Sequence, residues 1–224
     1  TGPSIGGTVL MRIRNLFGDP SLLLTLAALV LLGGCGSLPR VVVLNDPLSA
    51  EEHIRLGYAY EQSGDLEGAR REYLAALEND PRHPGALFNL GNIYAEEGRY
   101  KKSEGAYRRL LRMDPWHPGA NNNLASIYIH QGKKLTAAES MIEKAMAADP
   151  GRLAYYLDSQ AQLLLRRDRP MEAQLKLREA ETAPGSGESA FKKQHSRTRR
   201  QVNDAVASAL ASPETSKSKG ADVP

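Results

Sequence analysis

Two histidines occupy the same place in two nearly identical heptapeptides, DPRHPGA and DPWHPGA, which begin at Asp80 and Asp114. Histidine is a common zinc ligand, but a zinc site usually takes four ligands at about 2 Å from one ion. His83 and His117 would lie at the same corner of neighbouring structural units, roughly one helix–helix spacing of about 10 Å apart. No cluster of Cys or His supplies further ligands. We therefore interpret the heptapeptides as joints between repeated units and predict no metal site.

Residue types suited to catalysis form no recognisable set. The sequence has no Ser/His/Asp arrangement and no Gly-rich phosphate loop, and its five His are dispersed. Glu96 and Glu97 are neighbours that would point in different directions on a helix, and they are interpreted as surface charge. The formal net charge is only +3, without the basic stripe interleaved with aromatic residues that single-stranded nucleic acid requires. We predict a protein that is not an enzyme, needs no cofactor and binds no nucleic acid.

The spacing of apolar and small residues explains the two heptapeptides. One pattern of Leu followed by Gly or Ala, then Tyr, Gly, a small residue and Pro, occurs three times at a period of 34 residues, with one residue inserted near 133–135. These copies have their first Leu at Leu56, Leu90 and Leu124. A fourth, weaker copy ends at Pro184, and there the stretch RDRP at 167–170 replaces the glycine turn. A fixed period of this length predicts a solenoid of repeated units.

Each unit is predicted to be a pair of short helices. Ile54 and Tyr60 share a face with Leu56 at helical spacing. Gly64 suits the left-handed backbone after a helix end. Small residues such as Gly57 and Ala69 would let the paired helices approach closely. Prolines before and after each joint, such as Pro81 and Pro84, would stop one helix and begin the next.

This 34-residue unit resembles the tetratricopeptide repeat (TPR). The resemblance implies an all-α fold, a right-handed α-solenoid of about four helix–turn–helix repeats with a C-terminal capping helix. The repeats are placed at 50–83, 84–117, 118–152 and 153–185. A further helix is predicted over 186–211, with Phe191, Gln194, Thr198, Val202, Ala205, Val206 and Ala209 at helical spacing. Such a helix covers the exposed apolar face of the last unit. Its basic residues would face solvent or contact anionic lipid, and residues 212–224 are predicted to be disordered.

The start of the chain predicts export. Residues 1–34 are interpreted as a signal peptide with an upstream extension, in which residues 1–10 precede the expected initiator Met11. A basic stretch at 11–14 comes before a short apolar run that begins at Ser21. That run is shorter than the roughly 20 residues needed to cross a bilayer. Basic flank, short apolar run and small residues together are typical of a secretory signal peptide.

Cys35, the only cysteine, suggests a lipid anchor. Leu32-Gly33-Gly34-Cys35 resembles the bacterial lipobox, in which the cysteine thiol takes a diacylglyceryl group as a thioether and becomes the first mature residue. The alternative is a buried cysteine at the end of a transmembrane helix. Gly36 resembles an outer-membrane sorting residue. We expect an envelope lipoprotein, anchored at the outer membrane and facing the periplasm, with two or more acyl chains for stable anchoring.

Residues 35–49 are interpreted as the lipidated cysteine followed by a linker. The apolar run 41–44 would pack on the first repeat or pair with the sheet edge of a partner. Ser49 or the Asp46-Pro47 pair is expected to open the first helix, with Glu51 and Glu52 near its positive end.

The resemblance implies that the first helices of successive units line a concave groove. Position six of those helices is Arg55, Asn89, Asn123 and Ser159 in turn, and Asn there resembles the asparagine ladder of groove-binding TPR proteins. An amide both donates and accepts, so it matches the backbone of an extended peptide. The alternative is that Asn89 and Asn123 bond only between helices. The neighbouring groove positions are Tyr58, Phe88, Asn92, Asn122, Ser126 and His130.

These features favour a protein-binding scaffold or assembly factor that holds an extended segment of an envelope protein. The architecture is similar to the pilotin-like TPR lipoproteins of type IV pili, which help secretin rings assemble. A second possibility is an accessory subunit that delivers substrate to an envelope peptidase or glycan enzyme.

Overall fold

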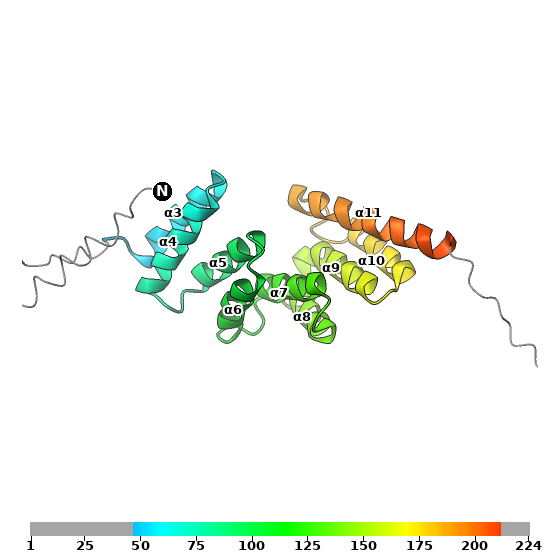
Figure 1. The fold of residues 1–224 in the computed structure, drawn as a ribbon, viewed down its shortest axis with the longest axis horizontal. Helices are drawn as coiled ribbons and strands as arrows, with labels where there is room; N and C mark the ends of the chain where they lie inside the picture. Colours follow the sequence, from blue (N-terminus) through cyan, green and yellow to red (C-terminus); the bar gives the residue numbers. More distant parts are fainter. Residues whose placement is uncertain (1–46, 212–224) are drawn as a thin grey trace, which may run out of the picture. The chain divides into compact units, whose positions relative to one another are not determined.

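The computed structural model describes residues 47–211, and every regular element in this range is a helix (Figure 1). The signal peptide, Cys35, the 41–44 run and the 212–224 tail lie outside the described residues. The α-helices are α3 (Ala50–Gln62), α4 (Leu66–Asn79), α5 (Pro84–Glu96), α6 (Tyr100–Leu111), α7 (Pro118–Gln131), α8 (Leu135–Ala148), α9 (Leu153–Arg166), α10 (Pro170–Thr182) and α11 (Ser189–Ala211). A short 3-10 helix, η1 (Pro150–Arg152), precedes α9.

Consecutive helices pack as pairs, and the pairs stack in sequence order. The pairs are α3–α4, α5–α6, α7–α8 and α9–α10, and each lies inside one of the four repeat ranges given above. The second helix of each pair contacts the first helix of the next, and α5, α7 and α9 also contact one another in order. This is the α-solenoid that the period predicts.

Side-chain caps fix where the helices begin. Ser49 and Glu52 form a reciprocal capping box at the start of α3, which confirms Ser49 as the opening residue. His83 and His117 are N-caps as well: their Nδ1 atoms accept from the N–H of the residue three positions on, at 3.4 and 3.1 Å. The histidines of the heptapeptides therefore begin helices α5 and α7, each followed by the predicted proline.

Left-handed residues end the first helix of three pairs and reverse the chain. Gly64, Gly98 and Gly132 have φ of 81°, 72° and 65°. Asp168 takes this role in the fourth pair at φ 57°, within the RDRP stretch that replaces the glycine turn. The inserted residue of the third repeat is accommodated by a second left-handed residue, Lys134, at φ 52°.

Glycines allow the close approach of paired helices in the first two repeats. A Cβ at Gly57 would lie 2.6 Å from the ring of Tyr73, and a Cβ at Gly91 would lie 2.5 Å from the ring of Tyr107. Both rings are completely buried. Ala69 is also fully buried, so the expectation for Gly57 and Ala69 is confirmed.

Helix α11 packs against α9 and α10 at the end of the solenoid (Figure 1). Its buried face is formed by Phe191, His195, Thr198, Val202 and Val206, four of which the helical spacing identified. Its basic residues are exposed, as both interpretations of that face require. None of the helices within residues 47–211 has the length and apolar character needed to cross a membrane.

The expectation of surface charge at Glu97 is wrong. Its side chain is only 16% exposed, and it forms ion pairs with Arg70 of α4 and with Arg99. Glu97 is the C-cap of α5 rather than a residue within the helix, so its side chain leaves the helix surface and reaches the preceding pair. Glu96, the last residue of α5, is exposed.

Candidate functional site

A pocket of about 430 Å³ lies between the first helices of the second, third and fourth pairs and helix α11. Helices α5 and α7 form most of its lining, α6 contributes two tyrosines, and α9 and α11 each contribute one glutamine. The described residues that line it include no Lys, Arg, Asp or Glu: they are Asn92, Ala95, Tyr100, Tyr107, Asn122, Asn123, Ser126, Ile127, His130, Gln162 and Gln194.

Five of the predicted groove residues come together in this pocket. Asn92 comes from the second repeat, and the other four, Asn122, Asn123, Ser126 and His130, come from the third. On α7, Ser126 lies three and four residues after Asn123 and Asn122, and His130 lies four residues after Ser126, so the helical register turns these side chains toward the pocket beside Asn92 of α5.

The other three predicted groove residues do not line the pocket. Tyr58 on α3 is 57% exposed. Phe88 packs its ring against His117, with the ring centroids 5.2 Å apart. Asn89 is half-buried and lies beside the Tyr73 side chain.

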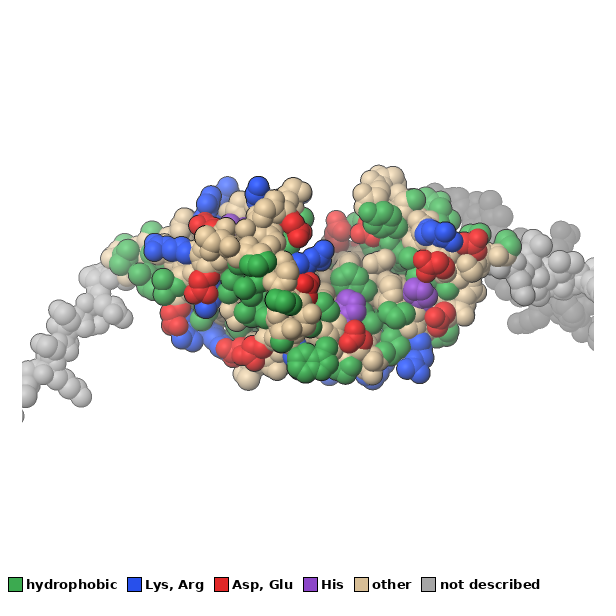
Figure 2. Space-filling view, turned by 180° about the vertical axis from the view of Figure 1, so that it is seen from behind, with side chains coloured by type: hydrophobic (Ala, Val, Ile, Leu, Met, Phe, Trp, Pro, Cys, Tyr) green, Lys and Arg blue, Asp and Glu red, His purple; other side chains and the backbone are tan. Residues whose placement is uncertain are grey.

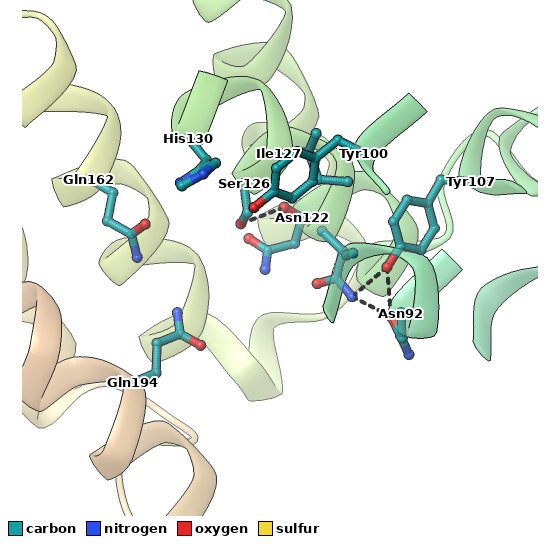
Figure 3. Close-up of a pocket in the computed structure, with 11 residues that line it drawn as sticks. Asn92, Tyr100, Tyr107, Asn122, Ser126, Ile127, His130, Gln162 and Gln194 are labelled. Atoms are coloured by element: carbon teal, nitrogen blue, oxygen red, sulfur yellow. Dashed lines mark hydrogen bonds between the residues drawn. The ribbon is translucent and has the colours of Figure 1, made fainter. Parts of the chain in front are cut away.

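One cluster ties the second and third repeats together at the pocket wall (Figure 3). The Tyr107 hydroxyl donates to Asn92 Oδ1 at 2.6 Å, and Asn123 Nδ2 donates to the same oxygen at 2.9 Å. Burial raises the pKa of Tyr107 to about 12, which keeps its hydroxyl protonated as a donor. The inter-helix bond proposed as the alternative role of Asn123 is therefore present, and the same residue also lines the pocket.

Asn122 differs from its neighbour. Its Oδ1 is buried and accepts no hydrogen bond from any described residue. The Ser126 hydroxyl donates to the Asn122 main-chain oxygen at 3.0 Å, so Ser126 leaves this amide side chain free. Asn122 lines the pocket and its Nδ2 group donates to no described residue, so this donor is suited to a ligand acceptor.

The opposite wall carries two glutamines that the sequence analysis missed. Figure 3 shows Gln162 and Gln194 across the pocket from Asn92 and Tyr107. Gln162 continues the repeat register, because it stands at the fourth-repeat equivalent of Ser126, and extending the register could have found it. Gln194 belongs to α11, where its helical spacing marked it only as a residue of the capping helix, and the repeat register does not extend to it.

The groove continues past His130 along α11. A second pocket of about 350 Å³ shares His130 and Gln162 with the first and is also lined by Arg166 and Gln201. At the other side, the Tyr100 and His130 rings lie 5.2 Å apart in a tilted arrangement. The two adjoining pockets offer an elongated site rather than a single closed cavity.

The arrangement supplies neutral hydrogen-bond donors and acceptors with little charge, which suits an uncharged polar ligand. Within residues 47–211 no three His, Cys, Asp or Glu side chains are grouped so that they could hold a metal ion. On the face shown in Figure 2, basic and acidic side chains are interspersed rather than gathered into a patch of one sign.

Comparison with protein families identifies the repeats. Two family models, both described as tetratricopeptide repeat, match residues 54–118 and residues 95–163. No curated protein matches the chain by sequence.

Solved structures share the fold at low sequence identity. A thermophilic TPR protein of Thermus thermophilus matches with a TM-score of 0.58 at 18% identity, over 72% of this chain and 90% of that one. A TPR protein of Parabacteroides merdae matches with a TM-score of 0.57 at 17% identity, over 93% and 80% of the two chains. The pilF protein of Pseudomonas aeruginosa matches with a TM-score of 0.54 at 21% identity, over 71% and 75%.

The period, the helix pairs, the family matches and the structural neighbours all agree. Residues 54–163 are tetratricopeptide repeats, and they form part of an all-α TPR solenoid that α11 closes at its C-terminal end.

Proposed function

We propose that this protein is a non-enzymatic scaffold or assembly factor, which binds an extended segment of another envelope protein in the groove between α5, α7, α9 and α11. A lipid on Cys35 would anchor it to the bacterial envelope, at the outer membrane and facing the periplasm. The TPR fold itself implies a protein partner. The observation that carries the proposal is the pocket lining, which is rich in amides and lacks Lys, Arg, Asp and Glu.

The chemistry of this lining favours a main-chain ligand. Each amide offers a carbonyl oxygen and an NH₂ group, which match the N–H and C=O groups of an extended peptide without reading its side chains. Asn122 and Ser126 stand one helical turn apart on α7 and thus follow the direction of the groove. A segment lying along them would reach the second pocket at His130.

Two narrower roles stay predictions. A pilotin-like role in type IV pilus or secretin assembly is consistent with the likeness to pilF, but at 21% identity this likeness reaches only the fold. An accessory role beside an envelope peptidase or glycan enzyme would use the same groove. The partner that the groove captures distinguishes the two.

Photo-crosslinking in the producing bacterium tests the proposal. A crosslinking amino acid at Ser126 on α7 is expected to trap a partner protein. The same amino acid at Glu143, exposed on α8 of the same repeat, is expected to trap none. Equal crosslinking from both positions would argue against the groove as the binding surface.

The lipid anchor has its own test. Cys35→Ser removes the thiol that would take the diacylglyceryl group, so we expect an uncleaved precursor that incorporates no labelled fatty acid. Metabolic labelling and the apparent mass of the product measure both effects. Label retained in the Cys35→Ser variant would remove the lipoprotein proposal and leave the groove proposal intact.

A further inference from the structure

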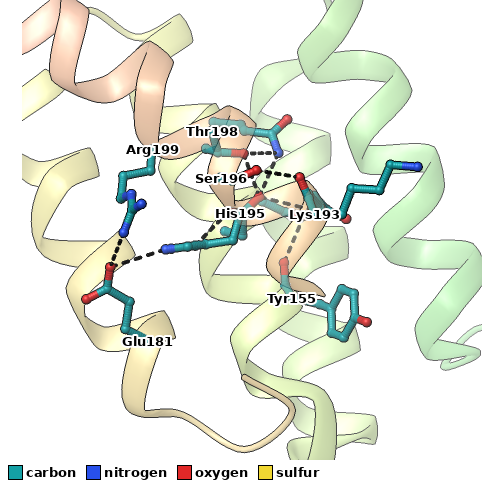
Figure 4. A network of polar contacts seen from close by, with 11 residues as sticks. Tyr155, Glu181, Lys193, His195, Ser196, Thr198 and Arg199 are labelled. Atoms are coloured by element: carbon teal, nitrogen blue, oxygen red, sulfur yellow. Dashed lines mark hydrogen bonds and ion pairs between the residues drawn. The ribbon is translucent and has the colours of Figure 1, made fainter. Parts of the chain in front are cut away.

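A completely buried carboxylate lies behind the glutamine wall of the groove. Asp158 on α9 is 0% exposed and is covered by α11. Its Oδ1 lies 3.2 Å from His195 Nδ1, and its Oδ2 accepts from Thr198 Oγ1 at 2.8 Å. Figure 4 shows that His195 in turn contacts Glu181, which also pairs with Arg199. The network fixes α11 on the last repeat.

The same carboxylate holds both glutamine side chains of the groove. Gln162 Nε2 donates to Asp158 Oδ2 at 2.9 Å, and Gln194 Nε2 donates to the same oxygen at 3.1 Å. A carboxylate oxygen accepts hydrogen bonds, so each glutamine must turn its NH₂ group towards Asp158. The amide orientation is therefore dictated by the chemistry of the partner.

This orientation leaves the two amide oxygens on the groove side. In Figure 3 the oxygens of Gln162 and Gln194 lie on the side of Ser126 and Asn122. Neither oxygen accepts a hydrogen bond from any residue in the described part of the chain. The wall formed by Gln162 of α9 and Gln194 of α11 thus presents two hydrogen-bond acceptors to the groove. Behind them, the buried Asp158 network separates the two side chains from solvent.

We propose that Asp158 is a positioning residue of the groove: it sets Gln162 and Gln194 as paired acceptors, which receive backbone N–H groups of an uncharged, extended peptide. This inference rests on the proposed function and names the ligand class of its groove. A ligand carboxylate would meet acceptor oxygens here, and a ligand ammonium would find no acidic side chain in the first pocket.

A peptide fits the site better than a glycan. Glycan hydroxyls could donate to the same oxygens, but sugar rings also pack on open aromatic faces. Tyr107 is completely buried, and the ring of Tyr100 is packed against His130. Asn92 Nδ2 and Asn123 Oδ1, opposite the glutamines, remain available after their mutual hydrogen bond, which adds the donor and acceptor that a peptide backbone needs.

The orientation can be measured on the full chain in detergent micelles, without a ligand. Selective ¹⁵N labelling of glutamine is expected to show two NH₂ groups protected from solvent exchange, assigned by their loss in Gln162→Leu and Gln194→Leu. Asp158→Leu should remove this protection. Asp158→Asn should keep it, because the Asn oxygen can replace Oδ2 while its NH₂ group faces His195. Unprotected amides in the unaltered protein would overturn the positioning role.

Peptide pools test the ligand class. The probes are capped decapeptides of Gly, Ala, Ser, Asn, Gln, Val and Leu, a matched pool with alternate N-methylated residues, and a pool that also contains Asp and Glu. We expect the uncharged pool to bind most tightly, and N-methylation to weaken binding about two- to tenfold for each hydrogen bond lost. Asp158→Leu should weaken binding and abolish the difference between methylated and unmethylated pools. Asp158→Asn should preserve it.

Val202→Ala provides the matched control, because it loosens the fully buried packing of α11 and removes no hydrogen-bond partner of either glutamine. It should keep the sensitivity to N-methylation. If peptides bind but their affinity changes neither on N-methylation nor in Asp158→Leu, this inference is overturned while the proposed function stands. Failure of every peptide pool, or binding of soluble peptidoglycan fragments in their place, would overturn the proposed function as well.

Discussion

Replacing Gly91 with leucine is expected to lower the free energy of unfolding by about 2–3 kcal/mol, in the upper part of the range for overpacked cores. A Cβ at this position would already lie 2.5 Å from Cε1 of Tyr107. The ring cannot move aside easily, since it is completely buried and its hydroxyl is hydrogen-bonded to Asn92. The leucine must therefore separate α5 from α6 or displace the ring from the core.

Gly105→Leu is the matched control. Gly105 is exposed on α6, and a Cβ there meets no atom within 4 Å. Because glycine costs a helix interior about 1 kcal/mol relative to good helix formers, this variant should be slightly more stable than the unaltered protein. Thermal unfolding should place Gly91→Leu roughly 4–12 °C below the unaltered protein. Equal melting temperatures for the two variants would contradict the packing of α5 on α6.

The later repeats explain why the glycine is needed. At the equivalent positions the third repeat pairs Ala125 with Ile142, and the fourth pairs Ala161 with Leu177, all of them buried. A smaller partner side chain leaves room for a Cβ, whereas the tyrosine ring does not. Gly91→Ala combined with Tyr107→Ile should therefore be more stable than Gly91→Ala alone.

The fold could be predicted because its signals are local. The glycines at the turns and the prolines at the joints each act within a few residues and have direct counterparts in the helix boundaries, and the period of 34 residues repeats them along the chain. Even the weaker fourth repeat followed its turn signal, with Asp168 in the left-handed conformation of the earlier glycines. The sequence left Ser49 and the Asp46-Pro47 pair open as the start of the first helix, and the capping box between Ser49 and Glu52 decides for Ser49.

The groove could be predicted only where it follows the repeats. Asn122, Asn123 and Ser126 share one helix face, which the register defines. Gln194 comes from α11, whose position depends on packing between distant segments, and no local pattern encodes that position. For the same reason Glu97 looked like surface charge, since its ion pair with Arg70 joins residues 27 positions apart.

The second large effect is expected at Asn122, where binding should weaken without a loss of stability. Its buried Oδ1 has no partner among the described residues, so a leucine of similar shape removes an unsatisfied polar group. Such a replacement is neutral or stabilising to the fold. The variant would lose up to two hydrogen bonds that the Asn122 NH₂ group donates to the bound segment, each contributing about 0.5–1.5 kcal/mol, so affinity should fall roughly five- to a hundredfold. Calorimetry and peptide titration on one protein preparation measure both quantities.

Asn123→Leu distinguishes a ligand contact from a structural one at the adjacent position. Its Nδ2 donates to Asn92 across the α5–α7 contact, so this variant should lose about 0.5–1.5 kcal/mol of stability as well as affinity. If both amides served only the fold, Asn122→Leu and Asn123→Leu would lower melting temperature together and affinity only in proportion. If both amides bind the peptide, affinity would fall in both variants, but the melting temperature would fall only in Asn123→Leu. Unchanged affinity in Asn122→Leu would show that the Asn122 amide does not bind the peptide. The result would be clear because the side-chain oxygen of Asn122 has no hydrogen-bond partner in the fold, so its replacement should not disturb the groove indirectly.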